Sequence, residues 1–372
     1  MKGGCVVEKV RLGDVCIRAS SNIAQKDVEN NEGTYPIYGA SGFIKNVDFY
    51  KQDKEYIAVV KDGAGVGRII KCPAKSSVIG TMQYILPKEN VDIDFLAFAM
   101  ENMNLAKYYT GATIPHIYFK DYCKEEFLLL DIKEQKNVAY ILNKISDLIS
   151  KRKEQLSKLD ELVKARFVEL FGDPVDNPMG WSTKQLQELV TDDCTISYGI
   201  VQTGDDQEDG VPVFRPVDIV NRIPVRSELK KTTEEISNKY KRTILKGREM
   251  LITVRANIAD TCIVGEEFAG CNVGRGIVPI RTKETEIILE FLKYQIDSKH
   301  LNDNIKALAK GITLIQLNME DLREVTLIVP PIEKQKAFVE FAKQTDKSKL
   351  EVQKSLEKLE LLKKALMQKY FG

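Results

Sequence analysis

The sequence predicts an α+β protein in which two globular segments of mixed α/β structure are separated by two long, antiparallel coiled-coil helices, in a pseudo-two-fold internal repeat. Three observations predict it: motifs recur 200 residues apart, two long stretches lack glycine and proline, and each globular segment has a strand-turn-strand pattern. The predicted parts are a first globular domain over 1–130, a first helix over 131–172, a linker over 173–180, a second globular domain over 181–330 and a second helix over 331–372.

The first globular domain is predicted to consist of short strands joined by turns. The segment YIAVV (56–60) is followed by the glycine-rich DGAGVG (62–67) and then by RIIKC (68–72). Valine and isoleucine favour strands, and glycine supplies the conformations that turns need. Residues 95–109 have the apolar spacing of an amphipathic helix, which completes a mixed α/β domain.

Two stretches, 133–170 and 333–370, are predicted to be long helices. They contain no proline or glycine, and apolar residues recur in them at heptad spacing, interrupted by Arg152 and Lys349. A helix of roughly 38 residues is about 57 Å long. Two such helices in one chain cover their apolar stripes most simply by pairing antiparallel. The predicted seam consists of Leu142, Ile145, Ile149, Leu156, Leu159, Val163, Val352, Leu356, Leu359 and Leu366.

The second globular domain is predicted to follow the plan of the first. It comes after GDPVDNPMGW (172–181), whose prolines and glycines are typical of a linker. The segments EMLITVR (249–255) and DTCIVG (260–265) are the expected strands, and 287–303 has the spacing of an amphipathic helix. Both predicted domains therefore contain a strand pair and then a helix.

The repeat is visible as identities at a fixed separation. Gln135 recurs as Gln335, and Phe171-Gly172 recurs as Phe371-Gly372, in a register that runs without a gap from Gly111 to the last residue. Further upstream the separation is 174 to 176 residues, so the second copy carries roughly two dozen extra residues in its globular part. Constant helices and variable globular parts are expected if the helices form a shared scaffold and the globular parts make the specific contacts.

Composition narrows the function classes. The chain has 372 residues, 43% of them hydrophobic, and a net charge of +1. Residues 1–130 carry 16 basic and 16 acidic side chains, and residues 181–330 carry 20 and 23, so bulk charge does not favour nucleic-acid binding. Seven cysteines, an odd number without a CxxC pair, indicate reduced thiols in a cytoplasm and no zinc site. Neither a signal peptide nor a membrane span is expected.

No catalytic, cofactor-binding or metal site is predicted. The chain has two histidines, His116 and His300, and no cluster with metal-ligand spacing. The glycines of 63–67 are not followed by Lys-Ser/Thr, so they do not form a P-loop, and a turn is the better interpretation. Asn177-Pro178-Met179-Gly180 lacks the second proline and the aromatic residue of an amino-methyltransferase motif, and is interpreted as linker.

The order of the motifs resembles a known family. YPIYGASGFI (35–44), a glycine-rich hairpin, TGATIPHIYFKDYCKEEFLLLDIKEQ (110–135) and a long helix ending in FVELFGD (167–173) are followed by the whole pattern again. This is similar to the specificity subunit of type I restriction–modification enzymes, and the resemblance covers essentially the whole chain. The first copy departs from it by having Leu130-Asp131 where the second has Pro330-Pro331.

The resemblance implies a non-catalytic subunit that binds double-stranded DNA. Each globular segment would be a target-recognition domain that reads one half of a split, asymmetric site. The two helices would form the spacer and dock two methyltransferase (modification) subunits, and restriction (motor-nuclease) subunits would join them. S-adenosylmethionine, ATP and Mg would be used by those partners and not by this chain. No membrane partner is implied.

Turn and loop residues with suitable chemistry are the candidates for DNA contact. Base readout uses Arg, Lys, Asn and Gln, and phosphate contacts use Lys, Arg, Ser and Thr. Any one candidate could instead be a solvated charge or a structural salt bridge, and Thr113 and Thr313 are expected to satisfy turns. If the two globular domains are held about 57 Å apart, they could contact DNA at two places that are separated by more than one helical turn of about 34 Å. The candidates are Lys45, Lys61, Arg68, Tyr118, Lys120, Arg215, Arg222, Arg226, Arg255 and Arg275.

Three alternatives stay open. The chain could be the specificity subunit of a related, type IIB-like system. It could be a single-chain restriction–modification enzyme of another type, against which the missing methyltransferase and nuclease motifs count. It could also be a coiled-coil scaffold with two ligand domains and no DNA, which the neutral charge balance permits.

Overall fold

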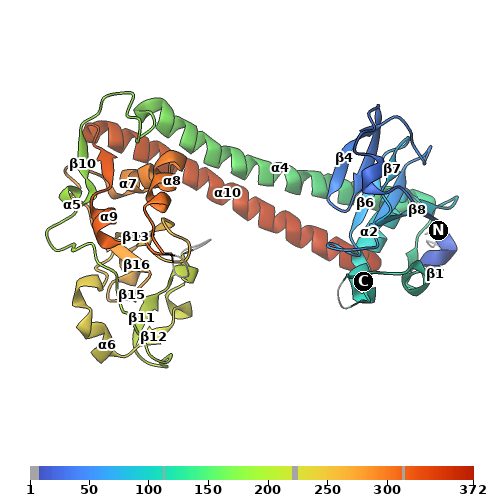
Figure 1. The fold of residues 1–372 in the computed structure, drawn as a ribbon. Coiled ribbons are helices and arrows are strands. Elements are labelled where there is room, and N and C mark those ends of the chain that lie inside the picture. The colour runs from blue at the N-terminus through green and yellow to red at the C-terminus, as the bar shows by residue number, and fades with distance from the viewer. Residues whose placement is uncertain (1–7, 112–113, 220–224, 312–314) are drawn as a thin grey trace, which may run out of the picture. The chain divides into compact units, whose positions relative to one another are not determined.

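The computed structural model describes residues 8–111, 114–219, 225–311 and 315–372 (Figure 1). The chain forms two compact units, one made of Met1–Glu154 with Val352–Gly372 and the other of Gln155–Glu351. Each long helix crosses from one unit to the other, because each of its halves packs against a different globular domain. The two units therefore each hold a globular domain and half of both helices.

The described residues of the first unit form three small sheets. In chain order its elements before the long helix are β1 (Glu8–Arg11), α1 (Leu12–Val15), β2 (Cys16–Ser20), η1 (Gln25–Asp27), β3 (Tyr35–Gly39), β4 (Gly42–Val47), β5 (Tyr56–Val60), β6 (Ile69–Cys72), β7 (Ser77–Val78), β8 (Met82–Pro87), α2 (Ile93–Asn102), η2 (Leu105–Tyr108), α3 (Phe119–Tyr122) and β9 (Glu126–Leu129). The sheets have the strand orders β2-β8-β5-β6, β4-β3-β7 and β1-β9. All five residues of β5 are buried, which fits its apolar sequence.

The second unit repeats this plan. Its elements between the long helices are β10 (Thr183–Gln185), α5 (Leu186–Leu189), β11 (Val211–Phe214), η3 (Pro216–Asp218), η4 (Arg226–Glu228), β12 (Lys231–Thr232), α6 (Glu234–Lys239), η5 (Lys241–Thr243), β13 (Glu249–Thr253), β14 (Thr261–Val264), η6 (Glu266–Phe268), β15 (Asn272–Val273), β16 (Ile277–Ile280), α7 (Leu289–Ile296), α8 (Lys299–Ala307), α9 (Met319–Arg323) and β17 (Thr326–Ile328). The sheets have the orders β14-β13-β16, β12-β11-β15 and β10-β17.

The internal repeat predicted from the sequence is confirmed by equivalent pairings. The predicted strand pairs are β5 with β6 and β13 with β14, both antiparallel. In each unit one strand also has a parallel neighbour, β3 with β7 and β11 with β15. The separation between copies grows from 176 residues at β3 and β11 to 193 at β5 and β13. Most of the extra length of the second copy therefore lies between β11 and β13, in the stretch that contains β12 and α6.

Two predicted helices are shorter than expected. The helix predicted over 95–109 ends at Asn102, and η2 follows Asn104, whose φ of 48° interrupts the helix. The helix predicted over 287–303 is two helices, α7 and α8, with a break at Asp297-Ser298. There the Asp297 carboxylate accepts a hydrogen bond from Thr261 at 2.6 Å, and the Ser298 hydroxyl donates to the Gln295 carbonyl at 2.7 Å. Side-chain bonds to local groups compete with helix continuation at such sites.

The two long helices are α4 (Ile132–Phe171) and α10 (Ile332–Phe371), each of 40 residues. In the first unit Leu142 of α4 shares a hydrophobic core with Met367 of α10, and the Lys153 ammonium lies 3.0 Å from the Glu360 carboxylate. The helix segments in this unit are therefore antiparallel. No described helix is both long and apolar enough to cross a membrane.

The second unit pairs its helix segments in the same antiparallel sense. The rings of Phe167 and Phe338 lie 5.4 Å apart, and Lys349 donates to Asp160 at 2.7 Å. Lys349, predicted to interrupt the seam, also reaches Asp346 at 3.2 Å. Burial lowers the pKa of Lys349, but its bonds to both carboxylates outweigh burial and raise it. The interruption is therefore tolerated as a local ion-pair network.

The ten predicted seam residues all lose at least part of their surface to packing. Five of them are buried: Leu142, Ile145, Val163, Val352 and Leu356. The other five are half-buried: Ile149, Leu156, Leu159, Leu359 and Leu366. Leu142 and Val163 also belong to the hydrophobic cores of the first and the second unit, so side chains of the globular domains help to cover the apolar stripe there.

The linker residues close the end of α4. Gly172 has a φ of 74°, the left-handed conformation common after a helix end. The Trp181 indole N–H donates to the Phe171 carbonyl at 3.0 Å, and the Lys334 ammonium lies 4.7 Å from the centre of its ring. The linker is thus fixed to both long helices within the second unit.

Candidate nucleic-acid interface

Residues 110–111 and 114–116, together called the hairpin loop, lie at the end of strand β5 in the first unit. The Thr110 and His116 backbones exchange two hydrogen bonds, of 2.8 and 2.9 Å. The Gly63 N–H donates to the Pro115 carbonyl at 2.9 Å, and the Ile117 N–H donates to the Lys61 carbonyl at 2.9 Å. The loop is therefore held against the glycine-rich turn that follows β5.

The glycine-rich turn needs glycine at Gly67. Its φ is 83°, and an added Cβ would lie 2.4 Å from the Ala106 nitrogen. No side chain fits there, because the obstacle is main chain that cannot swing aside. The turn is thus a structural element, as the sequence indicated, and it brings Lys61 and the start of the hairpin loop together.

Three of the five candidates in the first domain gather beside this loop. The His116 ring contacts the Asp62 carboxylate, and Lys61 lies 3.8 Å from the same carboxylate group. The His116 and Tyr118 rings lie 4.2 Å apart, and the Lys120 ammonium lies 5.2 Å from the centre of the Tyr118 ring. Tyr118 is 48% exposed. Lys61, Tyr118 and Lys120 therefore form one basic and aromatic surface, the chemistry that stacks on bases and pairs with phosphates.

The other two candidates lie elsewhere in the first unit. Lys45, on β4, donates to the Glu29 carbonyl at 3.0 Å. Arg68 donates to the Ala40 carbonyl at 3.1 Å, and it lines a hollow of about 630 Å³ with Lys71 and Lys363. Both side chains are attached to local backbone, so DNA contact by either one competes with a structural bond.

Residues 310–311 and 315–316 form the equivalent hairpin loop of the second unit, at the end of β13. The Lys310 and Gln316 backbones exchange hydrogen bonds of 2.9 and 3.0 Å, and the Leu317 N–H donates to the Val254 carbonyl at 2.9 Å. The Arg255 guanidinium donates to the Gln316 side chain. Asp62 with His116 in one copy and Arg255 with Gln316 in the other thus make equivalent contacts with different chemistry.

Arginines surround the end of β13 in the second unit. Arg255 lies there, and the Val254 N–H donates to the Gly276 carbonyl at 2.8 Å, which brings Arg275 to the same end. Arg215 borders this segment, because the Gly274 N–H donates to the carbonyl of its neighbour Phe214 at 2.8 Å. The second copy therefore concentrates three of its predicted arginines beside its hairpin loop.

The arginines differ in how many polar contacts their side chains make. Arg215 forms two hydrogen bonds with Asp218, of 2.8 and 3.0 Å. These hydrogen bonds raise the pKa of Arg215. Arg226 donates to the carbonyls of Glu267 and Ala269. Within the described ranges Arg275 is exposed and its side chain has no polar partner. Arg222, Thr113 and Thr313 lie outside the described residues.

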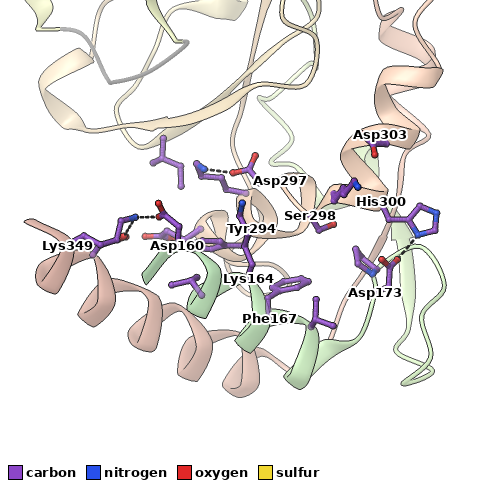
Figure 2. A pocket seen from close by; sticks show the side chains of 18 residues that line it. Asp160, Lys164, Phe167, Asp173, Tyr294, Asp297, Ser298, His300, Asp303 and Lys349 are labelled. Atoms are coloured by element: carbon purple, nitrogen blue, oxygen red, sulfur yellow. Dashed lines mark hydrogen bonds and ion pairs between the residues drawn. The ribbon is translucent and has the colours of Figure 1, made fainter. Parts of the chain in front are cut away.

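A large cavity of about 890 Å³ lies in the second unit, between the C-terminal half of α4, α10, α7 and α8 (Figure 2). Figure 2 shows Phe167 and Tyr294 among its apolar walls and the Lys349–Asp160 ion pair at one side. Burial raises the pKa of Tyr294 to about 12. Of the predicted residues only the seam residue Val163 lines this cavity, so it is separate from the arginine-rich surface.

One group at the edge of the cavity has the spacing of metal ligands. Ligand atoms of Asp173, Asp176 and His300 lie within 4.8 Å of one another. However, Asp173 accepts hydrogen bonds from the Val175 and Asp176 N–H groups, at 2.8 and 3.3 Å, and the His300 ring lies 3.1 Å from it. These bonds account for the group as the closure of the linker turn.

The contacts that hold the hairpin loops are the feature that sequence reasoning missed. His116 and Gln316 stand at the same place in the 200-residue register, and Asp62 and Arg255 each come two residues after a strand. Their positions could have been aligned from the repeat. Their contact could not, because the residue types differ completely between the copies.

A family model and the similar known proteins all belong to one family. A family model described as "Type I restriction modification DNA specificity domain" matches residues 6–159 and 178–361. The specificity subunit of the type I restriction enzyme EcoBI from Escherichia coli is 27% identical over 221 residues, 58% of this chain and 46% of that protein. The MjaVIII specificity subunit from Methanocaldococcus jannaschii is 25% identical over 97% of this chain and 91% of that protein. The chain thus spans less than half of the first relative and most of the second.

Two solved structures share the fold. The S subunit of a type I restriction–modification system from M. genitalium has a TM-score of 0.65 at 14% identity, covering 100% of this chain and 98% of that one. A chain from a structure titled for complex assembly and conformational transition of the type I R-M system has a TM-score of 0.56 at 16% identity, covering 98% and 97%. At these identities the likeness concerns the fold.

Proposed function

Because this chain belongs to the type I restriction modification DNA specificity family, we propose that it is the specificity subunit of a type I restriction–modification complex and reads a DNA site in two parts. Each globular domain, called a recognition domain from here on (residues 1–130 and 181–330), reads one half-site. The observation that carries this proposal is the duplication: both units hold a hairpin loop at the end of the same strand by equivalent contacts.

The two recognition domains differ where sequence-specific readers should differ. The first presents Tyr118 with Lys61 and Lys120, and the second presents Arg255 and Arg275. Arginine suits bidentate contacts with guanine, whereas tyrosine and lysine suit stacking and phosphate contact. The same scaffold with different side chains is what an asymmetric bipartite site requires.

The partners belong to the same proposal. Two methyltransferase subunits dock along the long helices, and restriction subunits join the assembly. S-adenosylmethionine, ATP and Mg serve the partners, this chain contributes no catalytic group, and the complex works in the cytoplasm. Support for docking comes from exposed leucines on the helices, Leu162 and Leu362, which no globular domain of their own unit covers.

A binding experiment tests the proposal. The chain is assembled with its methyltransferase partners, and DNA fragments are selected from a random pool at about 0.15 M salt. The proposal predicts one enriched pattern with two short specified blocks separated by unspecified bases. Footprinting of that fragment should protect both blocks. Equal affinity for all fragments would contradict DNA reading and favour the scaffold alternative.

A further inference from the structure

We infer that Gln135 and Gln335 are positioning residues that fix each recognition domain to its long helix and thereby determine which spacer length is accepted between the half-sites. The inference rests on the function proposed above. It concerns residues whose side chains cannot contact DNA directly, because both glutamines are buried, with 1% and 0% exposure.

The first joint is made by one side chain. The Gln135 carbonyl oxygen accepts a hydrogen bond from the Asp92 N–H at 2.8 Å. Its amide group donates to the carbonyls of Asn90 and Leu130, at 3.1 and 2.8 Å. Asp92 caps the start of α2, and Leu130 lies just before α4. The side chain therefore connects the long helix to the segment where α2 begins and to the residue that follows β9 just before α4.

The second joint repeats the first bond for bond. The Gln335 carbonyl oxygen accepts from the Ile288 N–H at 3.0 Å, and its amide donates to the carbonyls of Glu286 and Pro330, at 3.0 and 2.8 Å. Ile288 stands at the start of α7 as Asp92 does at the start of α2. All six bonds go to the main chain. The joint is therefore the same in both copies although the residues around it differ.

The chemistry of the joint requires glutamine. One neutral group must supply an acceptor and two donors at a buried site, which a carboxylate or an apolar side chain cannot do. Asparagine has the same group on a shorter stem and would not reach all three partners. Loss of the side chain would leave buried main-chain groups without partners, the costly outcome for a hydrogen-bonded core. Simple filling of space would not demand this residue twice.

The joint matters for spacer length because each long helix acts as a lever. A helix of 40 residues is about 60 Å long. A rotation of about 10° at its joint would displace the far end by about 10 Å, the length of roughly three base pairs. A chain that accepts only one spacer length must therefore limit rotation at this joint, and directional hydrogen bonds limit rotation better than apolar contact does.

The test uses the full chain assembled with its methyltransferase partners. Binding is measured to DNAs that carry both cognate half-sites with spacers from two base pairs shorter to two longer than the preferred one. The variants are Gln135→Leu and Gln335→Leu, with Gln135→Glu as a change that keeps the size and the acceptor but replaces both donors with an oxygen that faces two carbonyls. The control is Gln295→Leu. Gln295 is also fully buried and bonds twice to the Ile328 main chain, but it connects α7 to β17 inside the domain.

We expect the Gln135 and Gln335 variants to lower the preference for the correct spacer by about tenfold, while preference for the correct base within each half-site stays within about twofold. Gln295→Leu should lower the melting temperature without changing spacer preference. A uniform loss of affinity at all spacers, matched by the control, would assign the glutamines a purely structural role and overturn the inference, as would an unchanged spacer preference. A wild-type complex without any half-site preference would instead overturn the proposed function, and the inference with it.

Discussion

Leu162 and Leu362 occupy the same position in the two copies of the repeat, and they are exposed to nearly the same extent, 48% and 47%. Leu162 is on α4 and Leu362 is on α10. An exposed leucine kept at equivalent positions of both helices is expected where two copies of one partner bind to a pseudo-symmetric surface.

Changing either leucine to aspartate is expected to remove one partner. Leu162→Asp and Leu362→Asp should each weaken one methyltransferase site by about thirtyfold, the effect of about 2 kcal/mol at an interface hot spot. Native mass spectrometry of the assembled complex should then show one bound methyltransferase subunit instead of two. Leu350→Asp is the control, because Leu350 is 55% exposed but its counterpart is Ser150. Retention of two subunits by both test variants would contradict docking at these positions.

Arg275 and Arg215 are expected to respond differently to alanine. Arg275 is exposed without a polar partner among the described residues, so Arg275→Ala should weaken binding to the second half-site by about 1–3 kcal/mol and leave stability unchanged. Arg215 is bonded twice to Asp218, so Arg215→Ala should mainly lower stability. Fluorescence anisotropy on cognate DNA and thermal melting separate the two effects. The assignment fails if Arg275→Ala binds cognate DNA as the wild type does.

The aromatic cluster of the second unit should be the main source of its stability. Phe167 is buried, and its ring lies 5.2–5.5 Å from those of Phe171, Phe291 and Phe338. Phe167→Ala should cost about 3–5 kcal/mol. Urea unfolding followed by the fluorescence of Trp181, the chain's single tryptophan, reports this unit. The neighbouring Val168→Ala is the control, since Val168 is 53% exposed, and an equal shift in both variants would contradict the assignment.

Asp193 should make the second unit sensitive to acid. Hydrogen bonds from Lys246 and Thr191, with Arg281 nearby, hold the pKa of Asp193 below its ordinary value of 3.8. A group with a lowered folded pKa stabilises the fold above its unfolded pKa and loses that contribution as pH falls further. The stability difference between wild type and Asp193→Asn should therefore shrink as pH falls from about 5 to about 2. Urea unfolding at several pH values measures it.

The matched control for acid sensitivity is Asp192→Asn. Asp192 is exposed and adjacent, and it has no ionic partner among the described residues. This variant should follow the wild type at every pH. A difference between wild type and Asp193→Asn that stays constant across the range would refute the role of the Asp193 carboxylate.

The sequence predicted the long helices to within one residue at each end, 133–170 and 333–370 against α4 and α10. The helices could be predicted from local features of the sequence, which do not depend on tertiary contacts. These features are the heptad spacing, the absence of glycine and proline inside each helix, and Gly172 after the end of the first. The break at Asp297-Ser298 was not predicted, because it depends on a bond from Thr261, which is distant in sequence.

The sequence predicted which types of residue would make up the candidate site, but only in part where those residues lie in the structure. The bond between Arg215 and Asp218 joins residues three positions apart, so the sequence could have suggested that Arg215 is engaged. The gathering of Lys61, Tyr118 and Lys120 depends on how β5 and the hairpin loop meet, which the sequence does not show. The recurrence of Gln135 as Gln335 was visible in the sequence, but their contacts were not. Four of their six hydrogen-bond partners lie 43 to 49 positions away in the sequence. These partners are main-chain atoms, so the pattern of side chains does not reveal them.

The most direct test of two-part reading is an exchange of one recognition domain. Residues 1–130 are replaced by the corresponding domain of another family member, and the modified sites of the assembled complex are mapped by methylation sequencing. If each recognition domain reads its own half-site, one half-site changes while the other half-site and the spacer length between them stay the same. A change in both half-sites, or in neither, would contradict it.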